Sequence, residues 1–215
     1  MHITVFGAAG SVGRRVVAEA LARDHHVTAV VRDPARFKEL PAAAHPRAGD
    51  AASIGDVIEL SGGQDLVIAA TRPPAGHERD LVATTKVLLA GLAQTGVRLL
   101  ICGGAGGLTV PGSGAITVIE DPDLLAPAYR DLAQACIDQL QACRADTHVD
   151  WAYLSPPAQL EPGQRTGHYR LGGDELLVDA HGISAISIED LAVVLLDEAE
   201  RPRHHRTRFT AAARC

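Results

Sequence analysis

Three glycines at regular spacing near the amino terminus have the type and arrangement needed to bind a phosphate-containing ligand. Gly7, Gly10 and Gly13 occur in the stretch GAAGSVG, after an apolar run at residues 3–6 and at the start of a helical pattern. A pyrophosphate requires backbone N–H groups at a helix N-terminus and a tight turn without β-carbons. The stretch therefore predicts a dinucleotide-binding loop, in a GxxGxxG variant of the GxGxxG fingerprint. The further contacts expected in this loop are Ala9, Ser11 and Val12.

Two arginines follow the next strand-like segment, where the adenosine ribose of a dinucleotide is normally bound. The chain reads VVRDPAR there, with Arg32 in the first position after the strand and Arg36 one turn later. A guanidinium at this place pairs with the 2′-phosphate of NADP(H), so NADP(H) is favoured, while NAD(H) remains an alternative. Asp33 is competing evidence for NAD(H), but an aspartate before a proline is also a strong helix-start signal.

Small and acidic residues after two later strand-like segments complete the expected cofactor path. Asp50 follows a weak segment near residues 46–48 and is expected at the adenine edge. Ala69, Ala70 and Thr71 end an apolar segment and leave small side chains where the dinucleotide backbone passes. Both assignments depend on a parallel sheet whose strands end at one common edge.

The elements that must position these residues alternate regularly between strand and helix. The predicted strands lie at residues 3–6, 27–31, 66–70, 99–102 and 151–154, with the weak one near 46–48. The predicted helices lie near residues 11–23, 54–60, 80–95, 128–145 and 188–200. This alternation predicts an α/β fold, a Rossmann-type doubly wound parallel sheet, formed by residues 1–215 as a single domain.

Two long irregular segments, about residues 103–127 and 155–182, follow predicted strands. Both should emerge at the carboxyl edge of the sheet, where open α/β folds bind ligands. Gly172 and Gly173 stand between two short apolar runs and predict a small hairpin turn.

Composition excludes several classes of function. The formal charge of −6 and the absence of a clustered basic face argue against a nucleic-acid partner. No apolar run approaches the roughly 20 residues needed to span a bilayer, and the chain begins with a strand-like segment instead of a leader. We therefore expect a cytoplasmic protein without a membrane partner, as a monomer or homodimer that binds a small-molecule acceptor.

Neither the cysteines nor the histidines form a recognisable metal or disulfide pattern. The cysteines stand at positions 102, 136, 143 and 215, without a CxxC pair. Cys136 and Cys143 are expected to be buried thiols on one helix. The adjacent pairs at His25 and at His204 lack the i, i+4 spacing of helical ligands, so no metal is expected.

Five segments together resemble the atypical short-chain dehydrogenase/reductase group, and within it the proteins similar to NADH-flavin reductases and biliverdin reductase B. They are GAAGSVG, VVRDPAR, WAYLSPP, PGQRTGHYRLG and ISIEDLAVVLLDE. The resemblance covers essentially the whole chain and implies strand order 3-2-1-4-5-6 with a small C-terminal extension on the substrate side. It also implies that the glycine loop binds pyrophosphate, that Arg32 and Arg36 bind the 2′-phosphate, and that Gly103, Gly104 and Pro156 border the nicotinamide. Members of the group catalyse different reactions, so the substrate is not implied.

The acid and base that short-chain carbonyl reductases use are missing. These enzymes protonate an alkoxide with a Tyr followed four residues later by a Lys, but Tyr129 is followed at that distance by Ala133. The lysines are Lys38 and Lys86, and neither has a tyrosine at that spacing. A flavin takes hydride at one atom and a proton from water at another, so it needs no such pair.

The sequence therefore predicts an NAD(P)H-dependent oxidoreductase that transfers hydride to a flavin or a similar conjugated acceptor. Tyr129 and His168, with Tyr169 beside it, are the candidate proton donors if one is needed. The alternatives are a non-catalytic NADP(H)-binding redox sensor, and an epimerase, dehydratase or biosynthetic reductase on the same scaffold.

Overall fold

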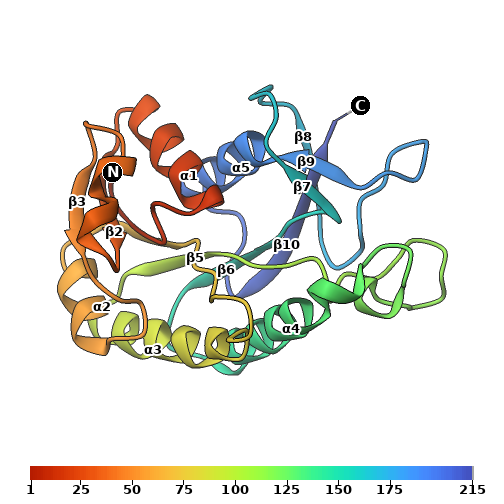
Figure 1. Ribbon diagram of the computed structural model, residues 1–215, viewed down its shortest axis with the longest axis horizontal. Coiled ribbons are helices and arrows are strands. Elements are labelled where there is room, and N and C mark those ends of the chain that lie inside the picture. The colour runs from red at the N-terminus through yellow and green to blue at the C-terminus, as the bar shows by residue number, and fades with distance from the viewer. Residues whose placement is uncertain (215) are drawn as a thin grey trace.

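The fold is a mostly parallel sheet between two layers of helices (Figure 1). A computed structural model describes residues 1–214, so Cys215 lies outside the described residues. The strands are β1 (His2–Phe6), β2 (His26–Val31), β3 (His45–Ala48), β4 (Leu66–Ala69), β5 (Arg98–Cys102), β6 (Trp151–Ser155), β7 (Gln159–Glu161), β8 (Tyr169–Gly172), β9 (Ala185–Ser187) and β10 (Thr207–Ala213). The α-helices are α1 (Ser11–Ala22), α2 (Ile54–Ser61), α3 (Asp80–Thr95), α4 (Arg130–Ala145) and α5 (Ile188–Glu200).

The main sheet has eight strands in the order β3-β2-β1-β4-β5-β6-β10-β8. Its first six strands are parallel and reproduce the expected order 3-2-1-4-5-6, which confirms the Rossmann-type fold. Helices α1 and α5 cover one face, and α2, α3 and α4 cover the other (Figure 1). The strand ends that precede the glycine loop, the arginines and the irregular segments therefore meet at one edge.

Alternating side chains along the central strands build the two cores. In β6, Trp151 and Tyr153 belong to the core beneath α2, α3 and α4, whereas Ala152 and Leu154 belong to the core beneath α1 and α5. Every residue of β4 and β6 is buried, as expected of strands covered on both faces. Such burial holds the carboxyl edge of the sheet rigidly in place.

The predicted helix ends carry their expected caps. Ser53 and Ser187 accept hydrogen bonds from the backbone N–H groups of Asp56 and Asp190, at 3.4 and 3.0 Å. Asp33 accepts from the N–H of Ala35 at 2.9 Å and begins a 3-10 helix at Pro34–Glu39. The helix-start interpretation of Asp33 is therefore confirmed.

The carboxyl-terminal third differs from the prediction. The prediction of a hairpin turn at Gly172 and Gly173 was wrong. Strand β8 pairs antiparallel with β10, a strand that the sequence pattern did not predict, and Thr210 lies opposite Gly172. The apolar run that follows Gly173, expected as the second strand of the hairpin, is not a strand. Its Leu176 packs instead against Leu108 and Val118. The segment predicted as irregular at 155–182 also contains β7, which pairs with β9 in a separate two-stranded sheet.

Cys136 and Cys143 are buried, as predicted, with exposed fractions of 8% and 0%. Burial raises the pKa of the Cys136 thiol to about 11 and that of Cys143 to about 12, so both are protonated at neutral pH. Among the helices of residues 1–214, none combines the length and apolar character that crossing a membrane requires. Within the same residues, no cluster of three or more His, Cys, Asp or Glu side chains is arranged to hold a metal ion.

Candidate active site

A large cleft of about 1080 Å³ runs along the carboxyl edge of the parallel sheet. One end lies at the tips of β2 and β3, and the other lies between α4 and the loop that follows β6. The loop between β5 and α4, predicted as a binding segment, contributes Gly103 and its neighbours to the wall. The position is the one at which doubly wound sheets bind dinucleotides.

Most of the residues expected at a cofactor site line this cleft. They are Gly7, Ala9, Gly10, Ser11, Val12, Arg32, Arg36, Asp50, Ala70, Thr71, Gly103, Gly104 and Pro156, together with Tyr129. The structure does not bring Gly13, Ala69 or His168 to the cleft wall. Gly13 and Ala69 are buried, and His168 is exposed on the loop before β8.

The three glycines have different structural roles. Gly7 has φ +79°, and a Cβ there would lie 2.5 Å from the carbonyl oxygen of Ala70 at the end of β4. A Cβ on Gly13 would lie 2.1 Å from the carbonyl oxygen of Gly7. Gly7 and Gly13 therefore allow the strand, turn and helix to pack closely, and Gly10 occupies the wall between them.

The N-terminus of α1 is left open toward the cleft. Its N-cap residue, Gly10, has no capping side chain, and the first turn has no acidic residue. Ser11 and Val12, whose N–H groups belong to this turn, line the wall. An uncapped helix N-terminus combined with a turn too tight for a Cβ fits the pyrophosphate of a dinucleotide.

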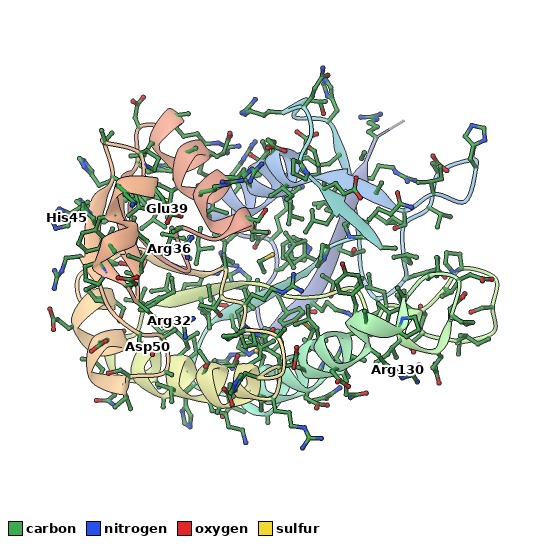
Figure 2. The ribbon with its side chains drawn as sticks, viewed as in Figure 1. Arg32, Arg36, Glu39, His45, Asp50 and Arg130 are labelled. Atoms are coloured by element: carbon green, nitrogen blue, oxygen red, sulfur yellow. The ribbon has the colours of Figure 1, made fainter. Side chains whose placement is uncertain are left out.

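Arg32 and Arg36 line the end of the cleft at the tips of β2 and β3 (Figure 2), and they differ in what they contact. Arg36 donates from Nε and Nη2 to the two carboxylate oxygens of Glu39 at 2.9 and 2.7 Å, and from Nη2 to the carbonyl oxygen of Ala9 at 2.9 Å. Arg32 is exposed and lines the cleft, and its side chain has no hydrogen-bond or ion-pair partner among residues 1–214. Arg32 is therefore the more available cation at this end.

The opposite end of the cleft is mainly apolar. Its walls are formed by Val118, Leu124, Leu125, Ala126, Leu132, Ala133, Pro156, Pro157, Ala158 and Leu160. Ala133 occupies the position where a carbonyl reductase would carry its lysine, and Gly106 packs so closely that a Cβ there would lie 2.9 Å from the Cβ of Ala133. A lysine side chain at position 133 would therefore need a different loop after β5.

A buried tyrosine, Tyr153, packs directly behind Gly103, and the sequence pattern did not single it out. A Cβ on Gly103 would lie 1.9 Å from Cζ of Tyr153, so glycine is required for this contact. The Tyr153 hydroxyl lies 2.9 Å from the carbonyl oxygen of Cys136 and 3.1 Å from Oε1 of Gln139. Burial raises the pKa of Tyr153 well above its ordinary value, and Tyr153 does not line the cleft. It supports the floor instead of exchanging protons with a ligand.

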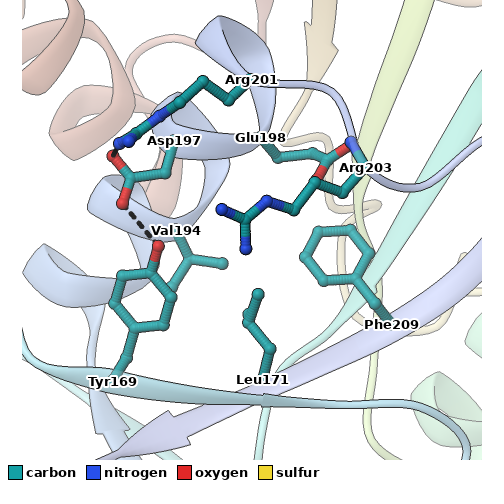
Figure 3. Close-up of a pocket in the computed structure, with 8 residues that line it drawn as sticks. All are labelled: Tyr169, Leu171, Val194, Asp197, Glu198, Arg201, Arg203 and Phe209. Carbon is teal, nitrogen blue, oxygen red and sulfur yellow. Dashed lines mark hydrogen bonds and ion pairs between the residues drawn. The ribbon is translucent and has the colours of Figure 1, made fainter.

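Tyr169 faces a different, much smaller cavity of about 70 Å³ between α5 and strands β8 and β10. Its hydroxyl donates to Asp197 at 2.5 Å (Figure 3). Neither Tyr169 nor His168 lines the large cleft, and of the proposed donors only Tyr129, which is 55% exposed, does so.

Residues 7–202 match the family described as NAD(P)H-binding. The chain belongs to this family. It is 33% identical over 219 residues to the "uncharacterized protein YwnB" of Bacillus subtilis, with 99% of each chain covered. This NAD(P)H-binding protein is also similar to two crystal structures. A "putative epimerase" from Bacteroides thetaiotaomicron is 34% identical with a TM-score of 0.88, covering 99% of this chain and 96% of that one. A "putative NADH-flavin reductase" from Streptococcus pneumoniae is 29% identical with a TM-score of 0.89 over 100% of both chains.

These comparisons confirm the resemblance to atypical short-chain dehydrogenase/reductases and the expectation of a nicotinamide cofactor. The expectation of an oxidoreductase is consistent with them at the level of class, and the relatives' differing names leave the acceptor open. Sequence reasoning missed Glu39, Tyr153 and the apolar wall. Of these, only the three-residue spacing of Arg36 and Glu39 is a signal visible in the sequence.

Proposed function

We propose that this protein is an NADPH-preferring reductase that transfers hydride to a flavin or a similar planar conjugated acceptor. The observation that carries the proposal is the cleft itself, which joins an open helix N-terminus and an Arg32 side chain unpaired within residues 1–214 to an apolar chamber beside Gly103. A dinucleotide and a flat acceptor require these two environments at the two ends of one cavity.

The cofactor would be held along the carboxyl edge of the sheet. Backbone N–H groups of Ser11 and Val12 would bind the pyrophosphate, and Arg32 would bind the 2′-phosphate. Gly103, Gly104 and Pro156 would border the nicotinamide, because all three line the same cleft as the glycine loop and follow the adjacent strands β5 and β6.

The apolar walls suit an acceptor that needs to be positioned but not protonated by a side chain. When bound, NADPH supplies one hydride, which together with one proton from water reduces an oxidised flavin to the dihydroflavin and leaves NADP⁺. The side chains of Leu124, Leu132 and Leu160 exclude water from the flat faces of the acceptor and hold it against the cofactor site. The exposed Tyr129 stands at the wall of this chamber, where water also reaches.

A second candidate is an epimerase or dehydratase that uses Tyr129 as acid or base. It is favoured by the position of Tyr129 on the cleft wall and by the name of the Bacteroides thetaiotaomicron relative. Tyr129→Phe separates the two functions, because only the second requires the phenolic hydroxyl.

Anaerobic mixing of the protein with NADPH and FMN or riboflavin, followed by the loss of nicotinamide absorbance, tests the proposal. We expect turnover with at least one flavin. Gly10→Val is the matched negative control, since even a Cβ at Gly10 would lie 3.1 Å from the carbonyl oxygen of Gly7 and the added methyl groups would fill the pyrophosphate wall. No turnover with either flavin, in protein shown to bind NADPH, would reject it.

A further inference from the structure

Among the described residues, one cationic side chain, Arg72, lines the cleft away from the tips of β2 and β3. Apart from the charged residues near the tips of β2 and β3, the charged side chains that line the cleft are Arg72, Asp80 and Glu161. Arg72 lies three residues after the end of β4, and Pro73 and Pro74 continue the wall beside it. The proposed cofactor binding and hydride transfer do not involve this arginine.

Arg72 is exposed, and its guanidinium makes no hydrogen bond or ion pair with any residue in the part of the chain that the structure describes. Two acids on the same connection have other partners: Glu78 accepts from the N–H of Gly76 at 3.0 Å, and Asp80 pairs with His77 at 3.5 Å. Backbone hydrogen bonds lower the pKa of Glu78, and the charge of Arg72 adds to that effect without a direct ion pair. An unpaired guanidinium on a cavity wall can accept a ligand anion without first breaking an internal ion pair.

The field of Arg72 reaches the floor of the acceptor chamber. Burial raises the pKa of the Cys136 thiol, and the charge of Arg72 opposes that rise. Cys136 lies on α4, one turn after Leu132 and beside Ala133, and it packs with Leu81 of α3. Arg72, Leu81 and Cys136 all line the same cleft.

We propose that Arg72 binds an anionic group of the acceptor, so that the preferred acceptors are planar conjugated molecules carrying a phosphate or a carboxylate. This inference rests on the proposed function. It adds that the ring system enters the apolar chamber while its acidic substituent is held at the rim by Arg72. A phosphate and a carboxylate accept the same paired N–H donors, so both satisfy the site.

The test compares pairs of acceptors in which one member carries an additional anionic substituent. FMN and riboflavin differ by one phosphate, and lumiflavin-3-acetate differs from lumiflavin by one carboxylate-bearing substituent. Binding of each to the protein saturated with NADP⁺ is followed by quenching of flavin fluorescence. We expect the anionic member of at least one pair to bind about tenfold more tightly than its neutral partner, and Arg72→Gln to remove that difference. The preference should also weaken as salt is added, because Arg72 is exposed.

Arg79→Gln is the matched control, since Arg79 lies on the same connection, is exposed and does not line the cleft. It should retain the wild-type preference despite the same change in net charge. Equal binding of both members in both pairs would overturn the inference while leaving the proposed function intact. The inference would also be overturned if Arg72→Gln weakened NADPH binding but left the acceptor preference unchanged, because Arg72 would then bind the cofactor and not the acceptor. If the wild type binds no flavin at all, the proposed function and this inference fail together.

Discussion

Arg36 is held by Glu39 through two hydrogen bonds, 2.9 Å from Nε and 2.7 Å from Nη2, and by the carbonyl oxygen of Ala9 at 2.9 Å. This arrangement fixes the guanidinium against the glycine loop and places a carboxylate beside it. The negative charge of Glu39 partly cancels the positive charge of Arg36. Arg32 has no such acidic partner among the described residues. The two arginines of the VVRDPAR segment are therefore not equivalent.

Arg32→Ala should weaken NADPH binding about tenfold and change NADH binding little, because only NADPH has the 2′-phosphate that a free guanidinium can bind. Titration of both cofactors by nicotinamide fluorescence measures the effect. Lys38→Ala is the control, since Lys38 is also exposed near this site but does not line the cleft. An equal loss for NADPH and NADH would contradict the phosphate-binding role.

Glu39→Gln should strengthen NADPH binding by about threefold while leaving NADH binding close to the wild-type value. Removing the carboxylate releases the charge of Arg36 toward a 2′-phosphate, and the gain is modest because both side chains are substantially exposed. Unchanged or weaker NADPH binding would show that the ion pair positions Arg36 for the cofactor instead of competing with it.

Gly13→Ala and Gly10→Ala should fail in different ways. A Cβ at position 13 would meet the Gly7 carbonyl at 2.1 Å, so thermal unfolding should show a loss of about 3 kcal/mol in the free energy of unfolding. Gly10→Ala, with a contact of 3.1 Å, should fold and lose cofactor affinity. Gly55→Ala in α2 is the control, because the nearest atom to its new Cβ lies 4.0 Å away. The same large loss of stability in both loop variants would refute this division of roles.

Glu198 should make stability depend on acid pH. Burial opposes its ionisation, but hydrogen bonds from Arg98, from His204 and from the backbone outweigh it and hold the pKa of Glu198 below its ordinary value of 4.5. Its contribution is therefore present above pH 4.5 and is lost as the pH falls through the lowered pKa. Glu198→Gln should cost about 3 kcal/mol at neutral pH, because it leaves Arg98 without its buried partner, and the difference from wild type should shrink below pH 4.5.

Denaturant unfolding at several pH values measures that dependence. Glu59→Gln is the control, since Glu59 is 68% exposed and forms a surface ion pair with Arg47. A difference between Glu198→Gln and wild type that stays constant down to pH 3 would contradict the linkage.

The sequence predicts the first six strands and all five α-helices because each is a local pattern: a short apolar run, or an apolar repeat with a cap such as Ser187. It does not predict β10, whose TRFTAAA segment has no strong apolar run. Nor does it predict β8 correctly, since Gly172 imitates a local turn while its true neighbour, Thr210, lies far along the chain. Pairing between distant segments leaves no signal in local spacing.

The same distinction holds at the site. The glycine loop and Arg32 could be predicted, because each follows directly from a strand end. The contact between Tyr153 and Gly103 could not be predicted, because it forms only when β5 and β6 pair. The missing lysine at Ala133 was visible in the sequence, but the apolar wall beside it combines Leu124, Leu132 and Leu160 from separate segments of the chain.

Tyr129→Phe should keep flavin reduction within about twofold of wild type, since the phenolic hydroxyl is not needed when water supplies the proton. A loss of a hundredfold or more, with NADPH binding intact, would instead indicate that Tyr129 is an acid or base and favour the epimerase-like alternative.

The most direct test of the central claim is the stoichiometry of hydride transfer in the absence of oxygen. Wild-type protein is mixed with NADPH and FMN or riboflavin, and the loss of nicotinamide absorbance is recorded together with the bleaching of the flavin. The account predicts that one flavin is reduced for each NADPH oxidised, with Gly10→Val inactive. Tight binding of NADPH without oxidation by either flavin would contradict it.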